Sequence, residues 1–192
     1  GLVTMITGFE SASEPVLKHM KKYTNPIGVR EMFDNVRIVN SENEQPMKFA
    51  MQLIIGYLNE TEEDFQLTVD FVKEYHDCMS SILTCSGFLM HETLKQKWIS
   101  EGNYMEYYNH VNFNTNYNTA EERLDRINRI EAVFNEIGIP HSVYNRGLYY
   151  DLKDKKDTET GDVYNIDDCK RPEVLSRFFN KTNDNKYVRK MI

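Results

Sequence analysis

The chain alternates between short apolar runs, typical of strands, and longer stretches in which apolar residues recur every three to four positions, as on one face of a helix. Four apolar runs predict strands: residues 2–7, 49–55, 79–85 and 140–144. Strands that alternate with helices form parallel sheets joined by right-handed crossovers. The pattern therefore predicts an α/β fold with a mostly parallel sheet.

Helical patterns fill the intervals between these runs. They cover residues 14–23, 26–40, 61–76, 93–101 and 119–137. The clearest helix starts are Thr61 and Thr119, each followed by acidic residues, because a threonine hydroxyl accepts from free backbone N–H groups and acids favour the positive end of the helix dipole. Residues 102–118 are rich in Asn and Tyr without a clean period. We expect them to form an irregular excursion over the mouth of the fold.

The composition fits one soluble globular domain with an added tail. The chain has 192 residues, 40% of them hydrophobic, which is enough for a core of ordinary size. Beyond Arg146 the sequence becomes mostly polar and charged, so we divide it into a domain at 1–146 and a polar C-terminal extension at 147–192.

Charge and cysteine content narrow the classes of partner. There are 30 acidic and 23 basic residues, giving a net charge of −7, which argues against binding to nucleic acid or an anionic membrane. No apolar run reaches the length of a transmembrane helix and no signal peptide opens the chain. Cys78, Cys85 and Cys169 are interpreted as free thiols. Together these features predict a cytoplasmic protein.

Two predicted strands end in segments with the character of ligand-binding loops. The first segment is Gly8–Ser13 and the second is Leu53–Thr61. Each runs from an apolar stretch through a glycine and polar residues into a helical pattern. Binding residues gather at the carboxyl ends of parallel strands, because backbone groups and helix N-termini converge there.

These segments also resemble the radical S-adenosylmethionine (radical SAM) superfamily, in the branch that often carries a cobalamin-binding domain. That branch has a G-[FIV]-E-S-x-S stretch and then x-V-L-K-x-M-x-K, matched here by Gly8–Ser13 and by residues 15–22. Its next strand typically reads I-I-G-L-P-G-E-T-x-E-D, matched by residues 54–64, with Leu58 and Asn59 in place of Pro and Gly. The resemblance covers roughly residues 1–145 and implies the C-terminal half of a (β/α) TIM-type barrel.

The family's cofactors follow from the resemblance, but one motif is missing. Radical SAM enzymes bind a 4Fe-4S cluster through a CxxxCxxC triplet, and no such triplet occurs in this chain. We therefore expect the cluster ligands on a missing N-terminal half of the barrel, and this chain to be an inactive fragment by itself. The resemblance implies S-adenosylmethionine as cofactor and leaves cobalamin as a further option. An isolated half barrel would expose unpaired sheet edges, which favours dimerisation.

The resemblance places contacts to S-adenosylmethionine at both strand ends. Glu10 is assigned to the ribose diol or the ammonium group, with Ser11 or Ser13 assisting. The alternative for Glu10 is an ion pair with a lysine such as Lys18 or Lys48. The alternative for Ser13 is to cap the following helix, and this is the favoured interpretation for Ser13.

The adenine ring is assigned to Ile54, Ile55 and Gly56, since it needs an apolar wall and a close backbone. An ordinary buried strand ending in a turn glycine explains the same residues. Glu60 and Glu62 are interpreted as helix-start residues.

Cys85 and Phe88 end the third strand and are candidates to line a substrate cavity, although packing is the favoured interpretation. The histidines show no HxxxH or HxH spacing, so no protein-bound metal is expected.

The sequence thus predicts a radical SAM fragment that contributes S-adenosylmethionine and substrate contacts for hydrogen abstraction from an unnamed substrate. A noncatalytic binding or scaffold module derived from the barrel is the alternative, motivated by Leu58 and Asn59.

Overall fold

The described part of the chain is built on one parallel sheet. The computed structural model describes residues 4–23 and 25–144. The sheet contains β1 (Thr4–Glu10), β2 (Lys48–Ile55), β3 (Met79–Gly87) and β6 (His141–Tyr144), in the order β1-β2-β3-β6. Every neighbouring pair is parallel. The α/β fold with a parallel sheet is therefore confirmed.

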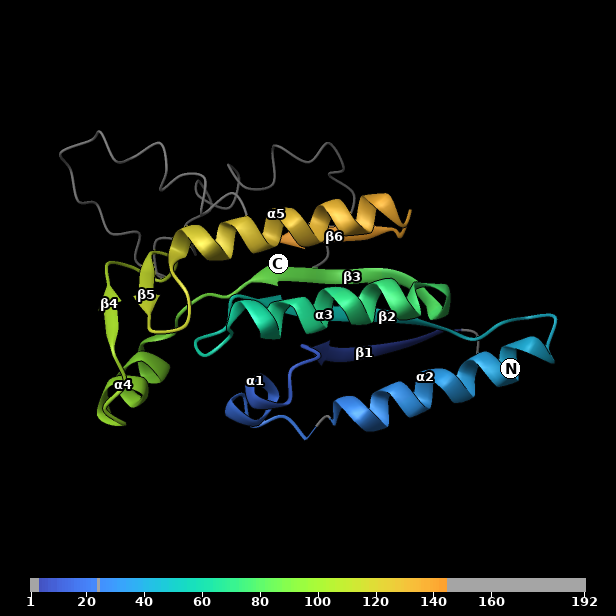
Figure 1. Cartoon of the computed structure of the whole chain (residues 1–192), viewed down its shortest axis with the longest axis horizontal. Coiled ribbons are helices and arrows are strands. Elements are labelled where there is room, and N and C mark those ends of the chain that lie inside the picture. Colours follow the sequence, from blue (N-terminus) through green and yellow to red (C-terminus); the bar gives the residue numbers. More distant parts are fainter. Residues whose placement is uncertain (1–3, 24, 145–192) are drawn as a thin grey trace, which may run out of the picture. The chain divides into compact units, whose positions relative to one another are not determined.

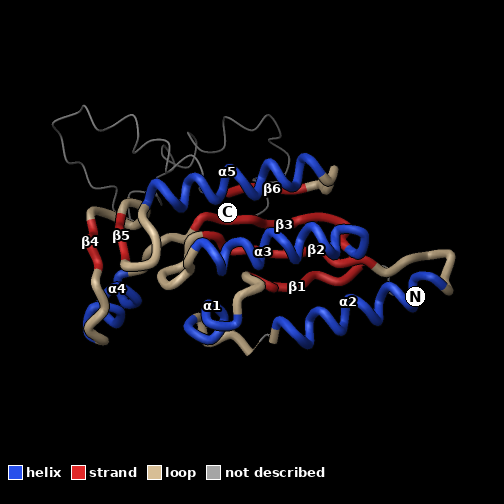
Figure 2. Tube along the Cα trace, viewed as in Figure 1, coloured by secondary structure: helices blue, strands red, loops and turns tan. Residues whose placement is uncertain are grey.

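The helices occupy two positions relative to this sheet (Figures 1 and 2). They are α1 (Glu14–His19), α2 (Pro26–Ser41), α3 (Glu62–Tyr75), the short 3-10 helix η1 (His76–Cys78), α4 (Glu92–Ser100) and α5 (Ala120–Glu136). Helices α2, α3 and α5 lie along one face of the sheet, whereas α1 and α4 lie near the carboxyl ends of the strands. None of the described helices covers the opposite face, which we call the helix-free face.

Aromatic side chains bind α2 and α3 to the covered face of the sheet. Phe9 of β1 stacks on Phe71 of α3 with ring centroids 4.4 Å apart, and Phe33 of α2 stacks on Phe49 of β2 at 4.6 Å. All four rings are buried. A second, smaller cluster around Trp98 packs α1 and α4 together near the strand ends.

The predicted helices and strands agree with the structure in order, but some of their predicted ends do not. The first helix ends at His19 rather than at 23, because Lys21 adopts a left-handed backbone with φ 58°. The expected irregular excursion at 102–118 is partly wrong, since it contains an antiparallel hairpin of β4 (Met105–Tyr107) and β5 (Phe113–Thr115). Strands of three residues are too short to show an alternating pattern, and the hairpin is held by the fully buried Phe113.

The predicted boundary at 146, the extension at 147–192 and Cys169 lie outside the described residues. All described residues belong to one unit of the chain, Gly1–Asp157. Among them, no helix is both long enough and apolar enough to cross a membrane.

Asp64 connects the N-termini of α1 and α3. Its Oδ2 accepts from the backbone N–H and the hydroxyl of Thr61, both at 2.9 Å. The Asp64 N–H donates to the Thr61 hydroxyl oxygen at 3.2 Å, which completes a capping box. Its Oδ1 accepts from the hydroxyl of Ser13 at 2.6 Å. Since Ser13 caps α1, one carboxylate orders the loops that follow both β1 and β2.

Replacing Asp64 by alanine is expected to lower the free energy of unfolding by about 2 kcal/mol, because one cap and one bond between the loops are lost together. Glu122→Ala is the matched control, since Glu122 occupies the same position in the capping box of α5 but makes no such link. Urea denaturation followed by circular dichroism measures both variants. Equal losses would contradict a connecting role for Asp64.

Candidate functional site

The two motif segments end neighbouring strands. Glu10 of β1 lies beside Leu53 of β2, and a bulge between Gly8 and Glu10 shifts the register at that point. Both segments therefore reach the same carboxyl edge of the sheet, followed by α1 and α3. This is the edge at which parallel α/β proteins bind ligands.

Glu10 has an unusual backbone and a nearly buried carboxylate. Its φ of 66° is left-handed, which is uncommon for a residue other than glycine and occurs preferentially at functional sites. The side chain is 12% exposed, and its Oε1 accepts from the ammonium of Lys22 at 2.9 Å. The expectation of a lysine partner is thus met, but by Lys22 rather than by Lys18 or Lys48.

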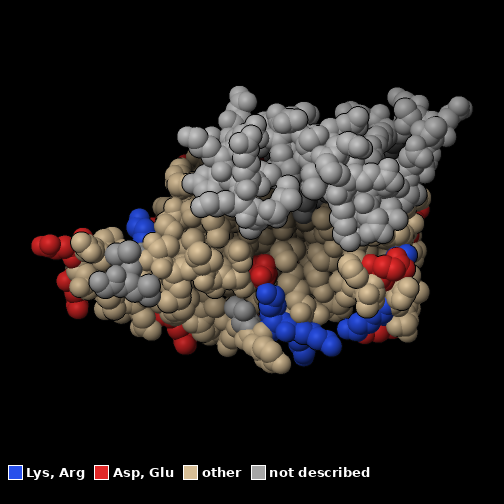
Figure 3. All heavy atoms as spheres, turned by 180° about the vertical axis from the view of Figure 1, so that it is seen from behind, with Lys and Arg blue, Asp and Glu red and all other residues tan. Residues whose placement is uncertain are grey.

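Gly8 makes room for this carboxylate. A Cβ placed on Gly8 would lie 2.9 Å from Oε1 of Glu10 and 3.5 Å from Oε1 of Gln52. Phe9, between Gly8 and Glu10, points into the core, so these polar groups lie on the helix-free face. Figure 3 shows the molecule from that side, where most of the described surface is uncharged. Glu10, Lys22, Gln52 and Gly8 are the candidate site.

The two serines of the first motif are engaged within the protein. Ser13 accepts from the Val16 N–H at 3.3 Å as the N-cap of α1, which confirms the capping interpretation. Ser11 is fully buried, its oxygen accepts from the Ser13 N–H at 3.1 Å, and it lies 3.4 Å from the Thr68 hydroxyl. Both hydroxyls thereby stabilise the loop that presents Glu10.

The predicted adenine wall is divided between the two faces. Ile55 is fully buried in the core under the helices, whereas Ile54 is partly exposed on the other face. Gly56 adopts φ 78°, and its N–H donates to Oε1 of Glu60 at 3.0 Å. A Cβ there would lie 2.3 Å from Cγ of Arg123. The close approach that Gly56 permits is therefore occupied by Arg123.

Cys85 packs inside the protein, and Phe88 is partly buried against the cluster around Trp98. Cys85 is fully buried in the core on the helix-covered side, and burial raises the pKa of its thiol. Phe88 meets the ring of Tyr57 edge-on at 4.8 Å. Among the described residues, no cluster of three or more metal-ligating side chains occurs.

The same edge of the sheet holds a buried ionic network that the sequence analysis did not predict. Glu60 precedes α3 and is only 1% exposed, and burial raises its pKa to about 7. Its Oε1 lies 3.4 Å from Nη1 of Arg126, which is itself 3% exposed. Glu62, interpreted as a helix-start residue, accepts from Nε of Arg126 at 3.1 Å. The network ties α5 to the end of β2.

Arg123 is the largest fully buried side chain in the described part of the chain. Its guanidinium lies 3.8 Å from the ring centroid of Phe113 and donates to the Phe113 carbonyl and to Oδ1 of Asn118. The spacing of residues along α5 already indicates that Arg123 is buried. Arg123 lies four residues before Ile127 and seven before Ile130, on the stripe that faces the core.

No family model, curated protein or solved structure matches this chain. The assignment of the site therefore depends on the groups that the fold brings together at the end of β1.

Proposed function

We propose that this chain is the C-terminal half of a radical SAM enzyme and supplies contacts to S-adenosylmethionine and substrate. The observation that carries the proposal is the position of Glu10. It has a left-handed backbone, it stands at the carboxyl end of a parallel strand, and its carboxylate lies over Gly8 on the helix-free face. The second motif segment ends the neighbouring strand.

The distribution of helices supports half of a (β/α) barrel. In such barrels the helices cover the outer face of the strands and side chains on the other face fill the interior. Here α2, α3 and α5 lie on one face (Figure 2). Across the other face runs a row of small and polar residues, with Gly8 beside Gln52 and Gln52 beside Thr84. Four parallel strands are half the number of a complete barrel.

The candidate site fits the polar groups of S-adenosylmethionine. Lys22 fixes Oε1 of Glu10, and among the described residues Oε2 has no hydrogen-bond partner. A carboxylate oxygen in this position can accept from an ammonium or a ribose hydroxyl. When bound together with a reduced cluster, S-adenosylmethionine supplies a radical that abstracts hydrogen, and this chain's residues would orient it.

The described cysteines do not fit the cluster. Cys78 is the last residue of η1 and Cys85 lies within β3, and the strand from Met79 to Cys85 that separates them is roughly 20 Å long at about 3.3 Å per residue. Both are buried. The proposal therefore assigns the cluster ligands to another segment of the complete protein.

Calorimetry with S-adenosylmethionine on the complete protein tests the site. Glu10→Gln is expected to weaken binding about tenfold, because a neutral amide oxygen is a weaker acceptor than a carboxylate for either donor. Gly8→Ala should also weaken binding, since the added Cβ displaces the carboxylate. Glu14→Gln is the control, an exposed carboxylate in the first turn of α1. Unchanged affinity in both site variants would refute the assignment.

A noncatalytic scaffold is the second candidate, favoured by the loop after β2. Leu58, in place of the family's proline, is fully buried in the cluster around Trp98. Asn59, in place of the glycine, donates to the Pro15 carbonyl at 3.2 Å. The loop is thus tied to α1 by its own side chains. Release of 5′-deoxyadenosine by the reduced complete protein supports the enzyme, whereas binding of S-adenosylmethionine without cleavage supports the scaffold.

A further inference from the structure

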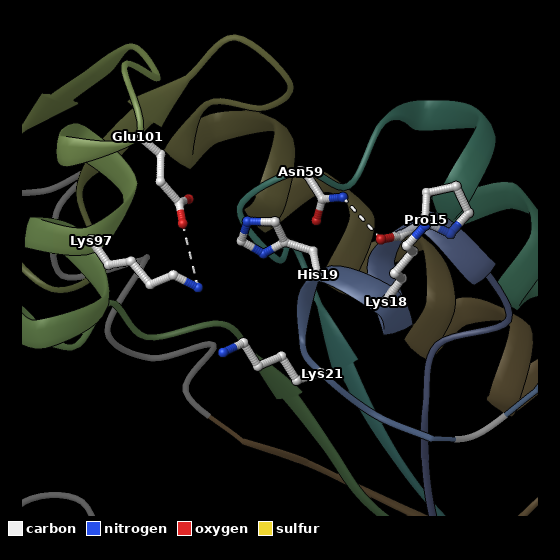
Figure 4. Close-up of a pocket in the computed structure, with 7 residues that line it drawn as sticks. All are labelled: Pro15, Lys18, His19, Lys21, Asn59, Lys97 and Glu101. Atoms are coloured by element: carbon white, nitrogen blue, oxygen red, sulfur yellow. Dashed lines mark hydrogen bonds and ion pairs between the residues drawn. The ribbon is translucent and has the colours of Figure 1, made fainter.

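A cleft lies near the carboxyl ends of three successive strands (Figure 4). It has a volume of about 430 Å³. Its lining comes from α1 and the turn after it, from the β2–α3 loop and from the end of α4: Pro15, Lys18, His19, Lys21, Asn59, Lys97 and Glu101. The segments that follow β1, β2 and β3 therefore all contribute to it. This is the position in which open parallel sheets bind their ligands.

Positive charge dominates the lining although the chain as a whole is acidic, with a net charge of −7. Among the described residues the lining holds three lysines and one carboxylate, that of Glu101, which lies 3.5 Å from the ammonium of Lys97. Neither Lys18 nor Lys21 forms an ion pair within residues 4–23 and 25–144. In Figure 4 the ends of Lys21 and Lys97 point into the same space.

His19 adds a neutral donor between the two helices. Its Nδ1 lies 3.2 Å from the hydroxyl of Tyr57, and its ring meets Trp98 edge-on at 5.2 Å. Burial, and then Lys97, lower the pKa of His19, while burial raises the pKa of Tyr57 to about 12. At neutral pH the Tyr57 hydroxyl keeps its proton, so it can donate to Nδ1. The imidazole then carries its own proton on Nε2, available to an acceptor in the cleft.

Helix dipoles account for each basic residue on its own helix but not for their meeting in one cleft. Lys18 and His19 lie in the last turn of α1, and Lys97 lies in the last turn of α4, where positive charge is favourable. That effect would be satisfied equally by side chains directed away from each other into solvent. The dipole effect does not explain why α1 and α4, which follow different strands, both place basic residues at one cleft. Nor does it explain Lys21, which lies in neither helix.

We propose that this cleft binds the phosphate group of a phosphorylated small molecule. A phosphate dianion offers several acceptor oxygens to the converging lysine ammonium groups and the His19 N–H, whereas a carboxylate offers two. The volume exceeds what a phosphate group alone fills, leaving space for the organic part of the molecule. This inference does not rest on the radical SAM assignment, because it uses none of Glu10, Gly8 or Gln52.

Nuclear magnetic resonance of the ¹⁵N-labelled 192-residue chain tests this site through the His19 ring. Inorganic phosphate and glycerol 3-phosphate are the two probes, and each should shift the ring signals saturably at millimolar concentration. A bound dianion should also raise the pKa of His19, because it stabilises the imidazolium. Tighter binding of the ester supports a phosphorylated small molecule. Equal affinity for the two probes would overturn that part of the proposal and leave a site for free phosphate.

Variants that change charge distinguish binding in the cleft from attraction to the overall charge of the protein. Lys21→Gln and Lys97→Gln are each expected to weaken binding roughly three- to tenfold, in the range of exposed charge-assisted contacts. Glu101→Gln should tighten binding, since it removes the one acidic side chain that the described residues contribute to the lining. Lys73→Gln on α3 is the matched control, with the same loss of charge at an exposed lysine outside the cleft. No saturable shift, or equal effects of Lys97→Gln and Lys73→Gln, would overturn the proposal.

Discussion

Replacing Gly56 by alanine is expected to destabilise the fold by about 3 kcal/mol, the combined cost of a left-handed backbone and of overpacking a buried site. The φ of Gly56 is 78°, which an L side chain adopts only under strain. The new Cβ would also lie 2.3 Å from Cγ of Arg123 and 2.4 Å from its Cδ. Arg123 has no room to withdraw, because it is fully buried and its guanidinium is bonded to Asn118 and Phe113.

Gly102→Ala separates the two costs. Gly102 has almost the same backbone, with φ 81°, but a Cβ there would meet nothing within 4 Å. Its replacement should therefore cost only about 1 kcal/mol, the backbone component alone. Denaturation in urea followed by circular dichroism measures both variants. If the two variants lose the same stability, the contact with Arg123 does not explain why position 56 is glycine.

The order of elements was predictable because it depends on local patterns. Thr61 and Thr119 both begin helices with complete capping boxes, as their acidic neighbours indicated. The apolar stripe of the last long helix, which includes Ile127 and Ile130, is buried as its spacing required. A cap or a stripe involves residues only a few positions apart, so the sequence alone contains all the information needed.

The candidate site was predictable only in part, because its geometry depends on contacts between distant segments. The motif indicated Glu10, but its left-handed backbone results from a bulge against β2, and its lysine partner was misidentified. Glu60 looked like one more acid at a helix start. Its partner, Arg126, lies 66 residues away on a helix whose polar positions looked exposed. Burial of a charge is a property of the packed structure and leaves little trace in local composition.

Glu60 is expected to make the stability of the protein fall as pH rises. Burial raises the pKa of this carboxyl from 4.5 to about 7, so the folded state binds the proton more tightly than the unfolded chain does. The resulting stabilisation is fully present below pH 4.5 and is lost as pH rises through 7. It corresponds to about 3 kcal/mol, at 1.36 kcal/mol per pKa unit.

Glu60→Gln tests this pH dependence because the amide still accepts from the Gly56 N–H but does not titrate. Arg126 keeps its bonds to Glu62 and to the carbonyl of residue 60 in this variant. Urea denaturation at a series of pH values from 4 to 8.5 should show the variant gaining stability relative to the wild type between about pH 4.5 and 7. The pKa values of Glu62 and Asp77 are lowered by arginine partners, so these residues change the stability only at lower pH and do so equally in the variant and the wild type. A constant difference across the range would mean that Arg126 holds Glu60 ionised in the folded protein. The network would then be a permanent ion pair between α5 and the end of β2, insensitive to neutral pH.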